Sequence, residues 1–296
     1  MDYVITWVNN QDSIWQEAYK NAKMATINQI STGERFRDDY NFLKYHLRGI
    51  EKNLPWIHKV YLVVSNEEQV PDWINQTKIK VITHSQIIPE KYLPTFNSCT
   101  IEMFLHNIPG LEEEFIYAND DTYPINPCSP EDFFQNGKPL IHLNQRRLAL
   151  AKGQFRKVII NTYNTVKKAF PSNIRLACGN YFKPEHLSLG HLKSIHDEVW
   201  KKLENEIYKS ISQFREAFNF NQYLFTFATV LAGYSIDKKI DGEYTAICKI
   251  PNKEWITKNK HKQICLNDTK NSTPKNFLMV KEAFEELFPN KSKYEN

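Results

Sequence analysis

The feature that most constrains the fold is the alternation of short apolar runs with amphipathic segments through the first half of the chain. The apolar runs have the length of buried β-strands, and the segments between them repeat apolar residues at helical spacing. Strands joined by helical crossovers are typical of parallel sheets. The expected strands are residues 2–8, 58–65, 78–83 and 114–118; a helix begins at a Ser13/Gln16 capping box, and others cover 38–53 and 97–107. We therefore predict an α/β fold with a doubly wound, mostly parallel sheet.

The pattern changes in the second half, where helical spacing dominates. Residues 154–169, 191–207 and 219–233 are predicted to be helices, and weaker strand patterns occupy 138–143 and 244–249. Thr273 and Pro274 have the residue types of an N-cap and first helical position, which predicts a last helix to about residue 287. We place a soft division near residue 145, giving parts 1–145 and 146–296 of one integrated catalytic domain.

Composition and charge exclude several classes of protein. The 296 residues are 41% hydrophobic, enough to bury a large core and too many for a disordered chain. The 38 basic and 34 acidic residues give a net charge of +4 without a long run of one sign, so no nucleic-acid partner is expected. The five widely spaced cysteines favour a reduced cytosolic setting. No signal peptide or membrane span is recognisable, so we expect a cytoplasmic protein.

The segment EFIYANDD, residues 114–121, runs from an apolar strand directly into Asn119, Asp120 and Asp121. If the chain stays extended, Asn119 and Asp121 share one face, and in an open α/β sheet ligands bind beyond the carboxyl ends of the strands. Carboxylates there have the chemistry to hold a metal ion. The alternative is an Asn-Asp turn, since both residue types bond their own backbone.

Several segments resemble the conserved blocks of the Stealth family, which includes bacterial capsular and exopolysaccharide phosphotransferases and the catalytic subunit of the animal N-acetylglucosamine-1-phosphotransferase. The first two blocks are matched by YVITWVNNQD (3–12), RFRDDYNFLKYHLRGIEKNLPWIHKVYLVV (35–64), VPDWI (70–74), LPTFNSCTIEMFLHNIPGL (93–111) and FIYANDD (115–121). GHLKS (190–194) with QFREAFNFNQYLFTF (213–227) resembles the third block. ICLNDT (264–269) with LFPNKSKYE (287–295) resembles the fourth.

The resemblance implies a GT-A-like nucleotide-sugar fold and transfer of a hexose- or N-acetylhexosamine-1-phosphate from a UDP-sugar to a sugar hydroxyl. The product would be a phosphodiester link in a bacterial capsular or exopolysaccharide, with release of UMP. Residues 1–145 would hold the nucleotide sugar and metal, and residues 146–296 would complete the active site on the acceptor side. The expected partners are a UDP-N-acetylhexosamine donor, a glycan acceptor and, at the cytoplasmic face of the inner membrane, the polysaccharide assembly machinery.

Four residues are predicted to carry the reaction, in roles that the resemblance implies. Asp120 and Asp121 would hold Mg²⁺ or Mn²⁺, hard ions that take one or two protein carboxylates and phosphate oxygens. His191 would act as general base or stabilise the transferring phosphoryl group. Arg215 would contact phosphate. The alternatives are a surface or capping histidine and a salt-bridged helix arginine.

A second set of residues is predicted to bind the donor. Either Arg35 or Arg37 is expected to contact phosphate, with Asp38 beside them as a site residue or a helix N-cap. The predicted donor contacts beyond the strand ends are Asn9, Asp12, Asn119, Asn267 and Asp268. Asp12 fits the start of a helix equally well. Asn97 and Ser98 open a helix, and two interpretations of them stay open. The N-terminal amides of this helix bind an anion in one interpretation, and Asn97 and Ser98 only cap the helix in the other.

Two other functions remain open. A glycosyltransferase on the same fold would use the same metal site, attack the anomeric carbon and release UDP. A non-catalytic nucleotide-sugar-binding subunit of a polysaccharide assembly complex would keep the fold without the chemistry. The chain contains no G-x-x-x-x-G-K-[ST] loop and no G-x-S-x-G elbow, which excludes the usual NTPase and serine hydrolase motifs.

Overall fold

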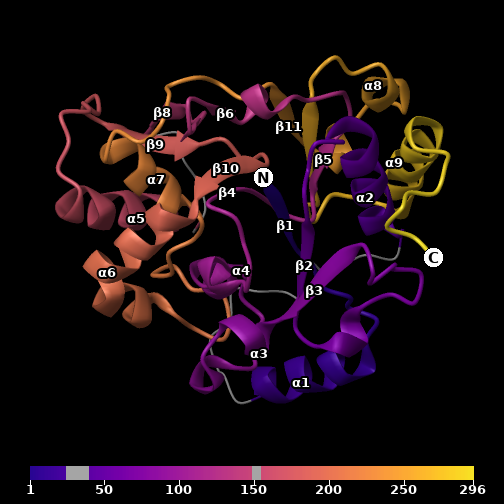
Figure 1. Ribbon diagram of the computed structural model, residues 1–296, viewed down its shortest axis with the longest axis horizontal. Coiled ribbons are helices and arrows are strands. Elements are labelled where there is room, and N and C mark those ends of the chain that lie inside the picture. Colours follow the sequence, from indigo (N-terminus) through magenta and orange to yellow (C-terminus); the bar gives the residue numbers. More distant parts are fainter. Residues whose placement is uncertain (25–39, 149–154) are drawn as a thin grey trace.

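The computed structural model describes residues 1–24, 40–148 and 155–296, and its centre is a five-stranded sheet (Figure 1). The strand order is β10-β4-β1-β2-β3. The strands are β1 (Asp2–Thr6), β2 (Val60–Val64), β3 (Ile79–Thr83), β4 (Glu114–Ala118) and β10 (Leu189–Leu192). β1, β2, β3 and β4 pair in parallel, and β10 pairs antiparallel with β4. The predicted α/β class with a mostly parallel sheet is confirmed.

The strand order also locates the place where ligands bind. From β1 the chain continues to β2 and β3 on one side, and β4 is then added on the other side of β1. The order therefore reverses between β1 and β4, and open α/β sheets bind ligands beyond the carboxyl ends of the strands at such a reversal. The segment that leaves β4 begins at Asn119, so the Asn119–Asp121 motif lies at this position.

Helices surround the sheet (Figure 1). α5, α6 and α7 group beside β10 and β4, α2 and α9 lie beyond the small sheet that contains β5, and α1 lies next to α3. The bounds are α1 (Ser13–Met24), α2 (Phe42–Asn53), α3 (His84–Ile87), α4 (Ser98–Met103), α5 (Phe155–Ala169), α6 (Lys193–Ser210), α7 (Tyr223–Leu231), α8 (Glu254–Thr257) and α9 (Pro274–Leu287). The cap of α9 is confirmed, because the Thr273 side chain accepts from the Asn276 amide and Pro274 is the first helical residue.

A second, three-stranded sheet extends from the carboxyl end of β4. β5 (Thr122–Pro124) follows the Asn119–Asp121 segment directly and pairs antiparallel with β12 (Gln263–Asn267), which pairs in parallel with β11 (Gly242–Ala246). The short pairs β6 (Phe134–Gln135) with β7 (Lys138–Pro139), and β8 (Leu143–Arg147) with β9 (Asn180–Pro184), complete the strands of the described chain. The small sheet therefore brings residues 263–267 beside residues 122–124.

The predicted helix 191–207 is wrong at its start. The chain forms β10 up to Leu192, and α6 begins at Lys193. All four residues of β10 are buried, and β10 completes the sheet beside β4. A Cβ added at Gly190 would lie 2.6 Å from the ring of Phe134, so glycine allows β10 to approach this ring.

Other helix starts also differ from the sequence prediction. The Ser13/Gln16 capping box does not form; Asp12 precedes α1 and its carboxylate accepts from the Ile14 amide at 3.0 Å. α2 begins at Phe42, directly after Asn41 at φ 55°, a left-handed conformation that a helix does not continue through. α7 begins at Tyr223 rather than at residue 219. The predicted strand 244–249 covers only part of β11 and ends in a 3₁₀ turn.

One hydrophobic cluster joins the two halves of the chain. It contains Phe115 and Tyr117 of β4 together with Val166 of α5, Val199 of α6 and Phe225 of α7, and all five are at most 1% exposed. The proposed division at residue 145 falls inside β8, which pairs with β9. The division into two functional halves stays a prediction.

Within residues 1–24, 40–148 and 155–296, no helix has the length and apolar character needed to cross a bilayer.

Candidate active site

The Asn119–Asp121 segment is a turn that leads from β4 into β5. The amide and the hydroxyl of Thr122 both donate to the Asn119 carbonyl, at 3.2 and 2.9 Å. The assumption of an extended chain, with Asn119 and Asp121 on one face, is therefore wrong and the alternative of a turn holds, because one backbone and one side-chain hydrogen bond close the turn. Asp120 is exposed at the turn, whereas the Asp121 side chain is only 24% exposed.

Asp121 meets His186 and Cys265, two residues far from it in the sequence. Its Oδ2 lies 3.5 Å from His186 Nε2, and the candidate ligand atoms of the three side chains lie within 4.8 Å of one another. Cys265 is brought there because β12 pairs with β5, opposite Thr122. The Leu266 amide donates to the Asp121 carbonyl at 2.8 Å. The tertiary structure thus joins the second and fourth sequence blocks at the carboxyl end of β4.

Each member of the Asp121–His186 pair changes the pKa of the other. Burial opposes charge on both groups, but their mutual attraction outweighs it: the pKa of Asp121 lies below its ordinary value of 3.8 and the pKa of His186 lies above 6.5. Burial raises the pKa of the Cys265 thiol well above 9, and the Asp121 charge adds to this. At neutral pH Cys265 is therefore a neutral thiol beside an acid–base pair.

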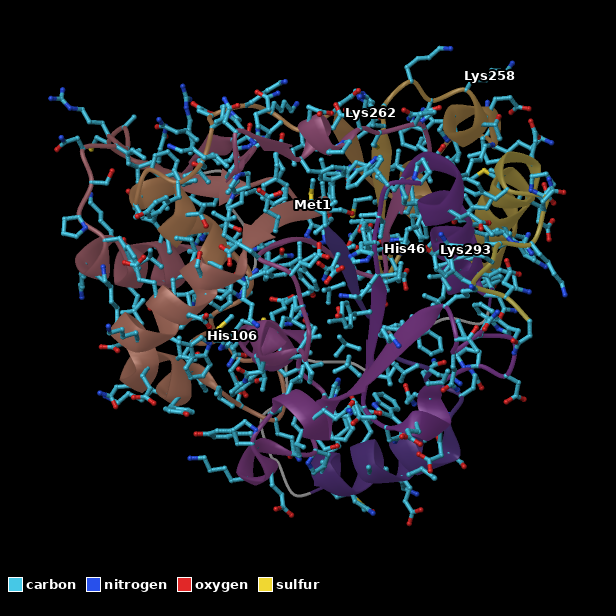
Figure 2. The ribbon with its side chains drawn as sticks, in the orientation of Figure 1. Met1, His46, His106, Lys258, Lys262 and Lys293 are labelled. Carbon is cyan, nitrogen blue, oxygen red and sulfur yellow. The ribbon has the colours of Figure 1, made fainter. Side chains whose placement is uncertain are left out.

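Hydrogen bonds fix the segment that carries His186. The Ser188 amide donates to Gln263 Oε1 at 2.9 Å, and the Ser188 hydroxyl lies 3.2 Å from Thr122 Oγ1. The Tyr3 hydroxyl lies 3.1 Å from both Ser188 Oγ and His46 Nε2. His46, labelled in Figure 2, is on α2, and burial lowers its pKa to about 3 so that it is neutral. This buried neutral network holds His186 opposite Asp121.

A second network links Arg215 to Asn119. Arg215 Nη2 donates to Ser98 Oγ at 2.5 Å at the start of α4. On the same helix the buried Glu102 accepts from the Gln222 amide at 2.7 Å, and Gln222 Nε2 donates to Asn119 Oδ1 at 3.0 Å. Burial raises the pKa of Glu102, while the positive charge of Arg215 lowers it. Arg215 therefore supplies a positive charge near the second-block motif.

His191 is not brought together with Asp121. It is paired with Phe115 in the first half of β4, whereas Asp121 lies beyond the other end of that strand. Its ring stacks on Phe115 at 5.5 Å and lies 3.2 Å from His196, and burial lowers its pKa to about 4. The histidine at the site is His186, which was not among the predicted residues. It lies four residues before the GHLKS segment (190–194), outside the matched third block, so no sequence signal pointed to it.

The remaining predicted residues occupy varied positions. Asn9 and Asp12 follow β1, where buried Gln69 accepts from the Asn9 amide at 2.6 Å and donates to Asp12 Oδ2 at 2.7 Å, while Asp12 also caps α1. Asn97 caps α4, because its side chain accepts from the Cys99 amide. Asn267 ends β12 and Asp268 follows it, near the Asp121 backbone. Arg35, Arg37 and Asp38 lie outside the described residues.

The Asp121 group has donors suited to a divalent metal. Asp121 Oδ1 is buried without a hydrogen-bond partner, and a cation would satisfy it. With His186 and Cys265 the group offers oxygen, nitrogen and sulfur, a softer set than the all-oxygen ligands of Mg²⁺. Asp120 is not a member of this three-residue group, and the predicted Asp120–Asp121 metal pair stays a prediction.

Comparisons with known proteins support the second of these blocks. Residues 35–141 match the family model described as Stealth protein CR2, conserved region 2. The chain is 31% identical to the receptor polysaccharide phosphotransferase WefC of Streptococcus oralis over 100% of this chain and 99% of that protein. It is 30% identical to the exopolysaccharide phosphotransferase cps2G of Lactiplantibacillus plantarum over 100% of this chain and 96% of that protein.

Solved structures resemble the chain only weakly. The inositol-1-phosphate CTP transferase from T. maritima has a TM-score of 0.45 and 14% identity, covering 99% of this chain and 98% of that one. The galactosyltransferase LgtC has a TM-score of 0.45 and 9% identity, covering 99% of this chain and 97% of that one. Both scores are too low to support an argument about mechanism. On the strength of full-length sequence identity to its relatives, the chain belongs to the Stealth family.

Proposed function

We propose that this protein is a phosphotransferase of capsular or exopolysaccharide synthesis, transferring a sugar-1-phosphate from a nucleotide sugar to a hydroxyl of a glycan acceptor. The observation that carries the proposal is the Asp121–His186 pair, 3.5 Å apart at the carboxyl edge of the sheet, in a chain whose relatives are named polysaccharide phosphotransferases. The proposed donor is a UDP-sugar, with a UDP-N-acetylhexosamine as the first choice.

His186 is the proposed general base, in place of His191. Asp121 faces the protonated Nε2 of His186 and orients the ring, so that the lone pair on Nδ1 is the one that takes the proton of the acceptor hydroxyl. The acceptor oxygen forms a bond to the β-phosphorus, the bond from that phosphorus to the bridging oxygen breaks, and UMP leaves. Tyr223, whose hydroxyl lies 3.5 Å from Nδ1, limits how the ring can rotate.

A bound divalent metal, proposed as Mg²⁺ or Mn²⁺, would be held by Asp121 with Asp120 beside it and would neutralise charge on the donor phosphates. Arg215, and Arg35 or Arg37, are proposed to contact those phosphates. Asn119 is held by Gln222 and is proposed to orient the donor. Asn9, Asp12, Asp38, Asn267 and Asp268 complete the proposed donor side.

The five cysteines are free in the structure, which suits a reducing compartment, and the proposed place of action is the cytoplasm or the cytoplasmic face of the membrane. Contact with polysaccharide assembly machinery is part of the same proposal.

Identification of the nucleotide product tests the reaction. The protein is incubated with Mg²⁺ or Mn²⁺, a panel of UDP-sugars and glycan acceptors, and the products are analysed by mass spectrometry. UMP together with a phosphodiester-linked sugar supports the proposal. UDP would mean glycosyl transfer, and absence of acceptor-dependent product over a broad panel would favour a non-catalytic binding subunit.

Two histidine variants then separate the candidate bases. His186→Gln is expected to lower the rate by ~10²- to 10⁴-fold, the usual contribution of a general base. His191→Gln is expected to retain transfer in the folded fraction, because His191 lies in the core at the other end of β4. Circular dichroism measures that fraction. Loss of transfer in folded His191→Gln with full activity in His186→Gln would reverse the assignment.

A further inference from the structure

A pocket of about 280 Å³ lies at the amino ends of β2 and β3, away from the Asp121 group. We call it the basic pocket, because Lys59, Lys78, Lys80 and Lys293 line it. His58 and Tyr294 also contribute, and no carboxylate is among the lining residues of the described chain. Lys293 lies on the side of the molecule that carries α2 and α9 (Figure 2). Four lysines therefore line one small concave surface.

Three distant segments build this pocket. Lys59 directly precedes β2, Lys78 and Lys80 flank the start of β3, and Lys293 comes from the C-terminal segment. That segment is held by backbone bonds, from the Asn75 amide to the Tyr294 carbonyl and from the Asn296 amide to the Trp73 carbonyl, both 2.8 Å. The lysines converge because the chain folds, and they form no cluster in the sequence.

The Arg48–Glu295 ion pair strengthens the same attachment. The Arg48 Nε to Glu295 Oε1 distance is 2.7 Å, and Arg48 Nη2 donates to Oε2 at 2.8 Å. The Lys293 amide donates to Glu51 Oε1 at 2.9 Å, which fixes the backbone of that residue. The C-terminal segment is therefore a fixed wall of the pocket.

Ordinary structural roles account for only part of this arrangement. β3 is an edge strand, and lysine on an edge prevents pairing with other chains, which explains Lys80. Neither Lys59 nor Lys293 belongs to an edge strand. Across the described residues none of the four lysines forms an ion pair; Lys59 Nζ donates to the Gly110 carbonyl at 3.4 Å, and Lys293 Nζ lies 5.1 Å from the centre of the Tyr294 ring. Two carboxylates adjoin the pocket without forming an ion pair with its lysines: Asp2, whose charge interacts with Lys59, and Glu51, which accepts from the Lys293 amide.

We propose that the basic pocket binds a phosphate group, either of an anionic lipid headgroup or of a soluble phosphate compound. Lysine ammonium groups bind phosphate as compact point charges, and four lysines line a space smaller than a typical drug-sized ligand site. The pocket opens at the amino ends of the strands and Asp121 lies past the carboxyl end of β4, so the bound phosphate is not the reacting one. A lipid headgroup bound there would anchor the protein to a membrane, and phosphate binding from either source is independent of the proposed reaction.

The adjoining Asp2, His58 and Glu112 do not make this a metal site. The Met1 ammonium lies 2.8 Å from Glu112 Oε2, and His58 contacts the other oxygen of that carboxylate at 2.5 Å. The Glu112 carboxylate is therefore already occupied by the Met1 ammonium and by His58, and a cation would also meet the charge of nearby Lys59.

A charge-matched pair of variants tests the proposal. The pocket variant is Lys78→Gln/Lys80→Gln/Lys293→Gln, and the control is Lys238→Gln/Lys258→Gln/Lys260→Gln, which removes three exposed lysines elsewhere. Binding is measured by sedimentation with vesicles of phosphatidylcholine alone or mixed with phosphatidylglycerol, and by calorimetry with inorganic pyrophosphate. Thermal unfolding followed by circular dichroism verifies that both variants fold.

Each lysine near an anionic surface contributes about fivefold to binding, so the pocket variant is expected to bind on the order of 100-fold more weakly. Loss confined to phosphatidylglycerol vesicles identifies a lipid headgroup, and loss of pyrophosphate binding identifies a soluble phosphate; both support the pocket. The proposal is overturned if the unaltered protein binds neither probe, or if the control variant loses as much binding as the pocket variant.

Discussion

Replacing Asp121 and His186 singly and together tests whether they act as one unit. The cycle uses Asp121→Asn, His186→Gln and the double variant. In the proposed mechanism Asp121 orients His186 and stabilises the imidazolium that forms when the acceptor proton is taken. Removing either partner disables the same proton transfer, so the two losses are not independent.

The structure sets the size of the coupling. Two unit charges 3.5 Å apart attract by about 5 kcal/mol at an effective dielectric constant of about 20. Both side chains are 24% exposed and the contact is at the limit of hydrogen-bond length, so solvent reduces this value. A hydrogen bond to a charged group contributes about 1.5 to 3 kcal/mol, and we expect a coupling of about 2 kcal/mol, or about 30-fold in rate.

The assay is kcat/KM for nucleotide release at saturating metal ion. Each single variant is expected to lose ~10²- to 10⁴-fold, with the double variant about 30-fold faster than the product of the two losses predicts. Saturating metal limits the contribution of weakened metal binding at Asp121. Losses that simply multiply would show that the two side chains act separately, and the base assignment would then be wrong.

The remaining predictions concern pH, stability and metal dependence. The pKa of His186 is raised and the base must be neutral, so kcat/KM should rise as the pH rises through that pKa. In Asp121→Asn this rise in kcat/KM should occur at lower pH, because burial without the Asp121 charge lowers the pKa of His186. A Cβ at Gly49 would lie 2.7 Å from a carbonyl oxygen of β5, so Gly49→Ala should destabilise by about 1 to 2 kcal/mol in urea unfolding despite its better helix propensity. Glu295→Gln should cost about 2 to 4 kcal/mol, because it leaves Arg48 without its anionic partner. Burial raises the pKa of Glu295, but hydrogen bonds from Arg48 outweigh burial and hold this pKa below 4.5. The stabilisation by the Arg48–Glu295 ion pair is therefore present at neutral pH and is lost as the pH falls through the lowered pKa. Dialysis against a chelator should abolish transfer, and Mg²⁺ or Mn²⁺ should restore it; activity unaffected by chelation would contradict the metal proposal.

The sequence was most informative where a local pattern decides the local structure. The run 114–118 became β4 without change, because every residue of the apolar part is buried on a central strand. Thr273 and Pro274 start α9, since capping depends on residues that are neighbours in the chain. The motif at Asn119–Asp121 was correctly located at the strand end, although the turn replaced the expected extension.

The sequence was least informative where a residue far away in the chain determines the position of a side chain. His186 and His191 are five residues apart in the chain. Only the register of β10 on β4 shows that the His191 ring packs on Phe115, whereas His186 lies beside Asp121. Cys265 gave no chemical signal, because its role depends on β12 pairing with β5. The lysines of the basic pocket likewise have no sequence pattern.

The sequence by itself determined the α/β class, the strand that ends just before Asn119 and membership of the Stealth family, because these follow from local periodicity and from residue identity along the chain. Only the tertiary structure decided that Asp121 pairs with His186 beside Cys265, and that four separated lysines share one pocket. Both groupings depend on strand pairing between segments far apart in the chain, and the energies of such contacts are not encoded in any one segment.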